Sequence, residues 1–456
     1  MRRSSLLKGG RLIDPAAGLD GAFDLLVRDG QIADVDAAGR LPVLDDGETI
    51  DCAGLWIMPG LIDPHVHLRD PGFPVKETIA TGLRAAAAGG FATVAAMANT
   101  SPVNDAPEIA RYMLERAREA RGARLIPVSA VTIGLRGREL VDFAAMAAAG
   151  ARLFSDDGIP IDDQAVLSQA LDAARGCGLA ISLHEEDRDL TADGAMNAGE
   201  TSKRLGVKGI PVGAETARVR RDLALAIGSE APVHVAHVSA AESIELIQAA
   251  RKNGAIVTCE VTPHHFTLDD GAVLEWGPDA RMAPPLRGRA DVDAIVAAMA
   301  GGAIDMIATD HAPHDPASKL KERLGGLFGR GRAPRLSTED ALELARAANG
   351  IVGLETAVGL TMALVHRGII APSRMAEMMS TNPARLLRLD DAGTLTMGAR
   401  ADITLIDPER EWTVEPARFE SKSRNTPFAG MKLRGRAVMT MVAGEIIYDR
   451  RGGEDR

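Results

Sequence analysis

Aromatic side chains are scarce in this chain of 456 residues, where Phe, Trp and Tyr together make up 3%. Proteins that bind single-stranded nucleic acids combine aromatic stacking platforms with basic grooves. The sequence offers neither feature, because its net charge is −11 and it contains no block of basic residues. The composition therefore argues against nucleic acid, or an anionic membrane surface, as a partner.

Cysteines and long apolar runs are also scarce. Cys52, Cys177 and Cys259 form no Cys-x-x-Cys pair and no framework of bridges, which is typical of a reducing cytoplasm. No segment approaches the roughly 18 uncharged apolar residues of a membrane span. Residues 1–15 lack the apolar core of a signal peptide. We therefore expect a cytoplasmic protein that does not interact with a membrane.

Eight apolar, strand-like runs alternate with alanine-rich helical segments through the middle of the chain. Near-continuous apolar strands separated by helices predict a parallel sheet that is covered on both faces. Eight such units in series predict a (β/α)8 TIM-like barrel within the α/β class. The expected strands lie in residues 55–67, 91–100, 123–132, 151–158, 178–187, 231–240, 255–265 and 303–314.

Both ends of the chain show short strands and glycine turns instead. The turns are expected at Gly9-Gly10, Asp29-Gly30 and Ala53-Gly54. Neither end holds enough strands for a stable sandwich by itself, so the simplest interpretation is a small composite β-sandwich built from both ends. We therefore predict that residues 1–58 and 391–456 form this sandwich and that residues 59–390 form the barrel.

Two segments follow the last expected strand. Residues 354–386 are helical and are expected to complete the outer ring of the barrel. Residues 315–337 are basic and rich in glycine. A segment of this kind is either a mobile active-site loop or a solvated insertion, and the sequence does not decide between the two.

Histidines gather at the carboxyl ends of the expected strands, where barrel enzymes place their chemistry. Nine of the ten histidines lie at or near these ends, and His366 is the exception. His65 and His67 are two residues apart on one strand, so their imidazoles share a face and form half of a metal site. Histidines scattered through a core or a surface would not be sorted in this way, so the pattern predicts a metal-dependent hydrolase.

Alternation along a strand decides some candidate ligands and leaves others open. His234 and His237 lie three residues apart and face opposite sides, and His237 is the better ligand because it is nearer the strand end. Asp156 and Asp157 are adjacent, so only one of them can point into the site, and alternation does not say which.

The other polar residues at strand ends are less directly assigned. His264 and His265 are expected to orient neighbouring groups rather than bind metal. Glu185 and Glu186 either do the same or are solvated. Four histidines with carboxylates are more than one zinc ion needs, and they suit two divalent ions that share a bridging carboxylate.

The motifs at these positions resemble those of the amidohydrolase superfamily, and within it the dihydroorotases of the longer, monofunctional bacterial type. The resemblance covers nearly the whole chain, including the split β-domain. Its motifs are DPHVHLRDPG (63–72), AAMANTSP (95–102), FSDDG (154–158), ATDHAPH (308–314), GIVGLETA (350–357) and SKSRNTPFAG (421–430).

The resemblance implies two divalent metal ions, for which the ligand types favour zinc and would also suit manganese or cobalt. The implied ligands are His65, His67 and Asp310 for the first ion, His184 and His237 for the second, and Asp157 as the bridge. Many relatives use a carboxylated lysine as the bridge, whereas the equivalent strand here offers aspartate and no lysine.

The implied reaction is the reversible cyclisation of N-carbamoyl-L-aspartate to (S)-dihydroorotate with loss of water, in de novo pyrimidine biosynthesis. In the hydrolytic direction a metal-bound hydroxide attacks the ring amide carbonyl, and Asp310 shuttles the proton. Arg69 is implied to grip the substrate carboxylate, which suits its planar fork of donors. The alternative for Arg69 is a salt bridge at the barrel mouth. The other implied substrate contacts are His67, Asn99, Ala283, His314 and Gly350.

Two departures from the family pattern touch the pocket wall. Relatives often have asparagine before Pro-Pro-Leu-Arg, where this chain has Ala283, so only the backbone of Ala283 can contact substrate. Relatives often have phenylalanine where this chain has Asn349. These changes leave the hydrolytic residues intact and bear on the choice of substrate.

Two other functions compete with this interpretation. An allantoinase- or hydantoinase-like enzyme would act on a substrate without a carboxylate, which would leave Arg69 unpaired. A catalytically silent partner in a pyrimidine-pathway assembly would be expected to have lost metal ligands, and here every position is filled. The oligomeric state is open, and a homodimer is the expectation for a barrel of this type.

Overall fold

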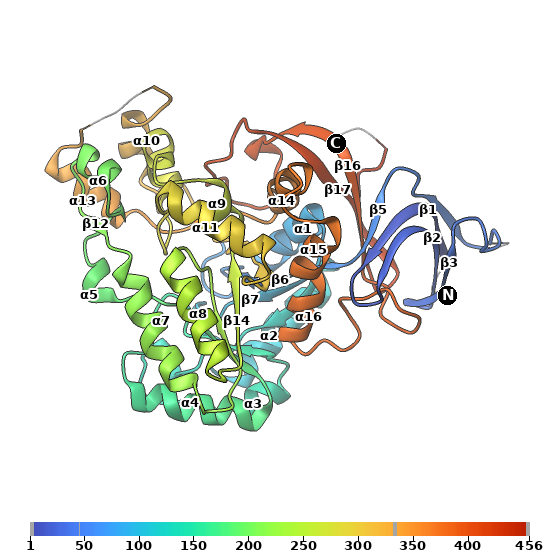
Figure 1. Cartoon of the computed structure of the whole chain (residues 1–456), viewed down its shortest axis with the longest axis horizontal. Coiled ribbons are helices and arrows are strands. Elements are labelled where there is room, and N and C mark those ends of the chain that lie inside the picture. The colour runs from blue at the N-terminus through green and yellow to red at the C-terminus, as the bar shows by residue number, and fades with distance from the viewer. Residues whose placement is uncertain (1–3, 45, 332–334, 453–456) are drawn as a thin grey trace.

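The computed structural model describes residues 4–44, 46–331 and 335–452. Strands from both ends of the chain form one eight-stranded sheet at one side of the molecule (Figure 1). Its strands are β1 (Ser5–Asp14), β2 (Leu19–Arg28), β3 (Gln31–Ala37), β4 (Glu48–Asp51), β5 (Trp56–Pro59), β16 (Ile403–Thr413), β17 (Lys432–Val442) and β18 (Glu445–Asp449). They pair in the order β18-β17-β16-β5-β1-β2-β3, with β4 beside β1.

This sheet encloses a separate apolar core to which both chain ends contribute, including Leu25 and Ile403. Two of the expected turns are confirmed, because Asp29-Gly30 separates β2 from β3 and Ala53-Gly54 lies between β4 and β5. The turn expected at Gly9-Gly10 is wrong. The strand β1 continues through these residues as a bulge, and Gly9 adopts a φ of 74° that suits glycine.

Each of the eight expected strand segments contains a parallel strand, and these strands form two sheets. The three-stranded sheet consists of β6 (Leu61–Val66), β7 (Phe91–Ala96) and β8 (Arg124–Pro127). The five-stranded sheet consists of β9 (Leu153–Phe154), β10 (Ala180–Leu183), β13 (Val233–Val235), β14 (Val257–Val261) and β15 (Met306–Ile307). A further pair, β11 (Met196–Asn197) and β12 (Gly209–Ile210), lies apart from both.

The α/β class is confirmed, but within the described ranges the paired strands do not close into one barrel sheet. The edge strands β9 and β15 have only two residues each, so they are too short to carry a ladder on both sides. At the two seams the pairing is reduced to single parallel bridges, from Ser129 to Phe154 and from Val66 to His311.

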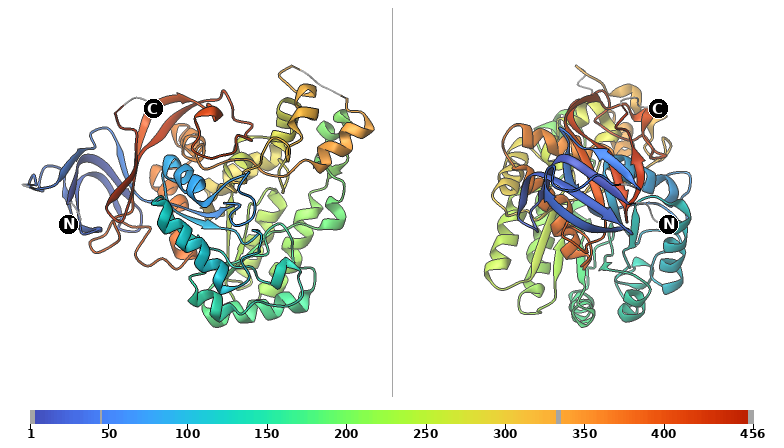
Figure 2. Two further views of the ribbon diagram at one scale, coloured as in Figure 1. Left: turned by 180° about the vertical axis from the view of Figure 1, so that it is seen from behind. Right: turned by 90° about the vertical axis from the view of Figure 1, so that its right-hand side faces the viewer.

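Helices surround the parallel strands, and the eight-stranded sheet packs at one end of this body (Figure 2). The N-terminal half contains α1 (Ile79–Gly89), α2 (Pro107–Ala120), α3 (Phe143–Ala148), α4 (Gln164–Cys177), α5 (Arg188–Thr191), α6 (Glu200–Leu205) and α7 (Gly213–Ala226). The C-terminal half contains α8 (Ala241–Lys252), α9 (Pro263–Thr267), α10 (Ala272–Trp276), α11 (Arg289–Ala300), α12 (Lys321–Leu324), α13 (Thr338–Arg346), α14 (Ala357–His366), α15 (Pro372–Ala376) and α16 (Asn382–Leu386). None of the helices in the described part of the chain is both long and apolar enough for a membrane crossing.

Local sequence signals set the ends of the helices that follow β6 and β9. The hydroxyl of Thr78 accepts from the backbone N–H of Thr81 at the start of α1, and Gly90 ends the helix with a φ of 95°. The carboxylate of Asp163 caps α4 in the same way, and Gly178 ends it with a φ of 66°. Both helices therefore return the chain to the next strand at a glycine.

The segment 315–337 is partly folded, and residues 332–334 of it lie outside the described residues. It contains α12 and a short 3-10 turn, Gly325–Leu327. Lys319 is completely buried, and its Nζ donates to the carbonyl oxygens of Pro278 (2.8 Å), Arg281 (3.2 Å) and Ala348 (2.8 Å). The start of the segment is therefore packed against the body of the protein. Residues 354–386 are helical, as expected.

The parallel strands direct their carboxyl ends to one end of the body, and a buried aspartate joins two of these ends. Asp63 in β6 accepts from the backbone N–H of His65 (3.1 Å), and also from the N–H (3.2 Å) and hydroxyl (2.5 Å) of Thr309. These bonds hold the residues after β15 beside the histidines of β6.

Candidate metal centre

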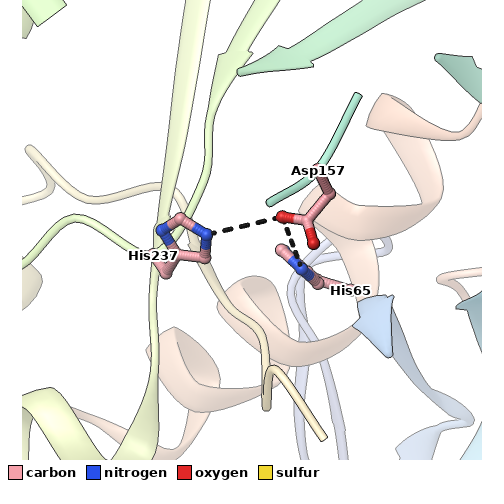
Figure 3. A group of neighbouring side chains, drawn as sticks. All are labelled: His65, Asp157 and His237. Carbon is pink, nitrogen blue, oxygen red and sulfur yellow. Dashed lines mark ion pairs between the residues drawn. The ribbon is translucent and has the colours of Figure 1, made fainter. Parts of the chain in front are cut away.

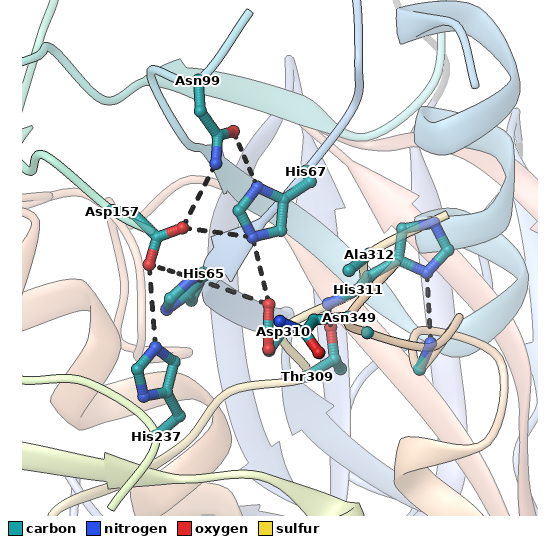
Figure 4. A network of polar contacts seen from close by, with 12 residues as sticks. His65, His67, Asn99, Asp157, His237, Thr309, Asp310, His311, Ala312 and Asn349 are labelled. Atoms are coloured by element: carbon teal, nitrogen blue, oxygen red, sulfur yellow. Dashed lines mark hydrogen bonds and ion pairs between the residues drawn. The ribbon is translucent and has the colours of Figure 1, made fainter. Parts of the chain in front are cut away.

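Asp157 lies at the centre of a buried group of four histidines, of which Figure 3 shows His65 and His237 and Figure 4 also shows His67. Its Oδ1 is 3.4 Å from Nε2 of His65, 3.3 Å from Nδ1 of His184 and 3.6 Å from Nε2 of His237. Its Oδ2 is 3.5 Å from Nε2 of His67. One carboxylate therefore faces imidazoles that three different strands, β6, β10 and β13, bring to the same point.

Asp310 adds a second carboxylate beside two of these histidines (Figure 4). Its Oδ1 is 3.1 Å from Nε2 of His67 and 3.7 Å from Nε2 of His65. Ligand-type atoms lie within 4.8 Å of one another in two groups, which are His65, Asp157 and His237, and His65, His67 and Asp310. The two groups share His65, so they lie side by side. His184 belongs to neither group, although its Nδ1 is 2.9 Å from Nε2 of His237.

The backbone at the site is held in conformations with positive φ, which residues other than glycine rarely adopt. Arg69, His237 and Asp310 have φ values of 58°, 34° and 46°. Such a conformation costs about 1–3 kcal/mol per residue and persists only where the surrounding structure imposes it, which is common at functional sites.

The structure decides between the adjacent carboxylates after β9. Asp156 turns away from the histidines and accepts from the backbone N–H groups of Val131 (2.7 Å) and Thr132 (3.0 Å). It also accepts from the Thr132 hydroxyl. Asp156 therefore fixes the loop that follows β8, and Asp157 is the aspartate that faces the site.

The donor set and its electrostatics suit a divalent cation. Nε2 of His65 is buried and has no hydrogen-bond partner among the described residues. Burial opposes a charge on this ring, but Asp157 and Glu260 outweigh burial and raise the pKa of His65 well above its usual value. Positive charge is therefore stabilised at this point, and imidazole nitrogen with carboxylate oxygen is the ligand chemistry of zinc and related ions.

Glu260 in β14 orients His65 from the side opposite the site. Its Oε1 is 2.8 Å from Nδ1 of His65, and its Oε2 is 3.0 Å from Nε2 of His234. When Nδ1–H of His65 donates to Glu260, the lone pair of Nε2 remains free for a cation. Sequence reasoning missed Glu260 because it lies within a strand. A glutamate near the end of a mostly buried strand is the signal that could have revealed it.

Replacing Glu260 with glutamine should weaken metal binding by about 10–100-fold, because the neutral amide no longer supports the basicity of His65. Competition with a chelator of known affinity measures this effect on the folded protein. Glu411→Gln, which changes an exposed glutamate of β16, is the matched control and should leave the affinity unchanged. Equal affinities for both variants and the wild type would show that Glu260 does not act on the metal.

The site opens into a cavity of about 230 Å³. Residues expected to contact substrate all line this cavity, and they are His67, Arg69, Asn99, Ala283, His314 and Gly350. Glu186 also lines it, and its Oε2 is 3.4 Å from Nε2 of His184. Glu186 is therefore part of the cavity wall, which the sequence did not decide.

Arg69 presents guanidinium donors that have no acidic partner. Its Nε donates to the carbonyl oxygen of Pro313 at 3.3 Å, and no carboxylate of the described residues pairs with it. Its Nη2 is 3.2 Å from Nε2 of His314, but that nitrogen is also 2.8 Å from the carbonyl oxygen of Asn349. If Nε2 of His314 donates to Asn349, it cannot accept from Arg69, so the fork of Arg69 stays available. Within the described ranges, the alternative of a salt bridge at the barrel mouth is not observed.

Protonation in this part of the cavity favours an anion. Burial lowers the pKa of Arg69 to about 10, so its guanidinium remains charged near neutral pH. Burial, with the positive charges of Arg69 and Lys319, lowers the pKa of His314 to about 2, so that imidazole is neutral. Arg69 therefore adds a fixed positive charge to the cavity wall.

Asn99 lies between two members of the cluster (Figure 4). Its Oδ1 is 2.9 Å from Nδ1 of His67, and its Nδ2 donates to Oδ2 of Asp157 at 3.3 Å. His265 lies farther out and bonds Thr262 (2.8 Å) and the carbonyl of Pro284 (3.0 Å). Asn99 thus contacts the candidate ligands directly, whereas His265 contacts the segment next to Ala283.

Family models and similar proteins were found for most of this chain. Residues 54–243 match the family model described as dihydro-orotase-like, and residues 368–448 match that of the amidohydrolase family. A dihydroorotase from Citrifermentans bemidjiense is 45% identical over 443 residues, which cover 97% of this chain and 99% of that protein. A dihydroorotase from Anaeromyxobacter dehalogenans strain 2CP-1 is 44% identical over 445 residues, covering 97% of each chain.

Solved structures of hydantoinases and dihydropyrimidinases share the fold. The L-hydantoinase (dihydropyrimidinase) from Arthrobacter aurescens has a TM-score of 0.84 at 25% identity, covering 98% of this chain and 96% of that one. The dihydropyrimidinase from Brevibacillus agri has a TM-score of 0.80 at 22% identity, covering 98% and 95%. The likeness extends over the eight-stranded sheet as well as the parallel strands.

Proposed function

The chain belongs to the dihydroorotase family of the amidohydrolase superfamily, and from this premise we propose how its own residues carry out the reaction. It is a metal-dependent cyclic amidohydrolase that interconverts N-carbamoyl-L-aspartate and (S)-dihydroorotate in pyrimidine biosynthesis. One observation supports the assignment to this site: two overlapping groups of metal-ligand-type side chains lie beside a cavity that is also lined by a guanidinium with no carboxylate partner among the described residues.

We also propose that the two parallel sheets are parts of one (β/α)8 barrel formed by residues 59–390. The single bridges between their edges, from Ser129 to Phe154 and from Val66 to His311, support this. Residues 1–58 and 391–456 would form the accompanying β-sandwich. We propose that the protein works in the cytoplasm as a homodimer. Its substrate is a small molecule, and neither nucleic acid nor a membrane is a proposed partner.

The proposed cofactors are two divalent ions, with zinc preferred. His65, His67 and Asp310 would hold one ion, His184 and His237 would hold the other, and Asp157 would lie between them. When bound, divalent ions lower the pKa of water and polarise a carbonyl oxygen. The overlapping groups around His65 support this arrangement.

Asp310 is proposed to move the proton. Burial alone would raise the pKa of its carboxyl, but the hydrogen bond with His67 and the nearby His65 hold it well below the usual range. The ionised carboxylate can accept a proton from the attacking water and deliver it to the ring nitrogen as the amide bond breaks. In the cyclisation direction the same carboxylate takes the proton from the carbamoyl nitrogen as the nitrogen–carbon bond forms, and it returns the proton to the carboxyl oxygen that leaves as water.

Arg69 is proposed to bind the substrate carboxylate. A guanidinium fork makes two parallel hydrogen bonds to a carboxylate, which fixes both the position and the plane of the ring. His314 and Asn99 lie beside it on the cavity wall and would add hydrogen bonds. Ala283 offers only its backbone, because its methyl group has no hydrogen-bonding atom.

A second candidate is the hydrolysis of another cyclic amide, as in allantoinases and hydantoinases. The structural likeness to the A. aurescens L-hydantoinase favours it. Arg69 disfavours it, because an uncharged substrate would bury the guanidinium without a partner. A catalytically silent partner in a pathway assembly is disfavoured because each proposed ligand position is filled.

Removing divalent cations with a chelator should abolish dihydroorotate ring opening, and adding zinc back should restore it, because the hydrolytic water needs a lowered pKa. Elemental analysis of the active protein should find up to two divalent ions per chain. A preparation that contains no metal and yet retains full activity would contradict the proposed mechanism.

A further inference from the structure

The segment 421–430 contacts the active-site loops from outside the cavity. It lies between a short 3-10 turn, Pro416–Arg418, and β17, and none of its residues lines the cavity. It nevertheless contacts the loop between β6 and α1, which carries Arg69, and the loop after β15, which carries His314. The segment therefore joins the two loops that form the proposed carboxylate-binding part of the cavity.

The first contact is made to a buried glutamate in the loop between β6 and α1. The hydroxyl of Ser421 donates to Oε2 of Glu77 at 2.5 Å, and the backbone N–H of Lys422 lies 3.2 Å from both Glu77 oxygens. The hydroxyl of Ser423 donates to the carbonyl of Lys76 at 2.6 Å. Glu77 is completely buried, so these bonds fix the end of the loop.

The second contact is made by the side-chain amide of Asn425, which is 1% exposed. Its Oδ1 accepts from the backbone N–H of His314 at 3.0 Å. Its Nδ2 donates to the carbonyl oxygens of Ala312 (3.1 Å) and Gly350 (3.0 Å). The side chain therefore uses both of its donors and its acceptor to join the loop after β15 to the segment that begins at Gly350.

The loop after β15 and the segment that begins at Gly350 also contact each other directly. Gly350 has a φ of 107°, and a Cβ atom there would lie 2.4 Å from Cβ of Ala312. The backbone N–H of Ala312 also donates to the carbonyl of Ile351 at 2.7 Å. Losing the amide of Asn425 would therefore shift the two segments against each other rather than separate them.

A shift between these two segments would move the groups that face the substrate carboxylate. Nε of Arg69 donates to the carbonyl of Pro313, and the ring of His314 contacts the carbonyl of Asn349. Both acceptors lie within one residue of a group that Asn425 holds. The metal-type ligands are fixed by other residues, such as Asp63 for β6 and Glu260 for His65.

We propose that Asn425 is a positioning residue that sets Arg69 and His314 for the substrate carboxylate. This inference rests on the proposed function, because it assumes a substrate that carries a carboxylate. Asn425 would affect substrate binding and leave the metal ligands and the proton transfer unaffected.

Asn425→Asp tests this with a side chain of the same size. The carboxylate can still accept from His314, but it places an oxygen against the carbonyls of Ala312 and Gly350. We expect KM for dihydroorotate to rise by about 10–100-fold, as for buried polar groups that lose their donors. We expect kcat to stay within about threefold and the metal content to stay unchanged, because this variant leaves the metal ligands and the proton transfer unaffected.

Asn382→Asp is the matched control at the other end of the strands. Nδ2 of Asn382 donates to the carbonyl of Asp305, just before β15, at 2.9 Å. This variant should change neither KM nor metal content. If Asn425→Asp does not fold, Asn425→Ser takes its place, because its shorter, uncharged side chain also removes the bonds to the two carbonyls.

The same substitution in an Arg69→Lys enzyme shows whether Asn425 acts through Arg69. We expect the additional rise in KM to be much smaller there, because residues that act together are not additive. An unchanged KM for Asn425→Asp, a loss in kcat alone, or an equal rise in both backgrounds would overturn the inference. A wild-type enzyme that does not open dihydroorotate would instead refute the proposed function itself.

Discussion

Asp310→Asn should lower kcat for dihydroorotate hydrolysis by about 10²–10⁴-fold, the usual contribution of a positioned general acid–base group. The amide has the shape of the carboxylate but cannot accept the proton from the attacking water. Steady-state kinetics at saturating substrate measure the effect. The metal content of the same preparation must be determined, because Asp310 is also a proposed ligand.

The control is Asp293→Asn, which changes an exposed aspartate of α11 that pairs with Arg289. It should leave kcat unchanged. If Asp310→Asn keeps its full metal content and turns over at a near-wild-type rate, Asp310 does not transfer the proton.

Arg69→Met should lower kcat/KM for dihydroorotate by about 10²–10³-fold, because leaving a buried charge without its partner costs about 2–5 kcal/mol. Methionine keeps much of the side-chain volume and removes every donor. An uncharged cyclic imide should lose far less, since it has no carboxylate for Arg69 to bind. The comparison of the two substrates on one variant isolates the recognition of the carboxylate.

Equal losses on the charged and uncharged substrates would show that Arg69 supports the cavity without reading the carboxylate. In that case the hydantoinase-like alternative would gain support, because the argument against it depends on Arg69 binding a substrate carboxylate.

The sequence predicted which side chains come together, because parallel strands place their carboxyl ends together. His65 and His67 are two residues apart, and alternation alone puts both on one face. Alternation could not separate Asp156 from Asp157, since adjacent residues differ only in which face they take. The bonds that turn Asp156 away come from Val131 and Thr132, which belong to another loop.

Other features depend on contacts that the local sequence does not contain. Glu260 contacts His65 only through the folding of the chain, which brings Oε1 of Glu260 in β14 to 2.8 Å from Nδ1 of His65. Gly9-Gly10 has the composition of a turn, but pairing with β2 on one side keeps β1 extended through a bulge. The strands β9 and β15 each have only two residues. The apolar pattern of the sequence did not predict this, because it does not fix where a strand begins and ends.

The kcat/KM values of the zinc-loaded enzyme for dihydroorotate, allantoin and hydantoin, measured side by side, test the assignment of dihydroorotate as the substrate. We expect dihydroorotate to be strongly preferred, because it alone among the three offers a carboxylate to Arg69. A preference for allantoin or hydantoin, or no activity on dihydroorotate with metal bound, would contradict it.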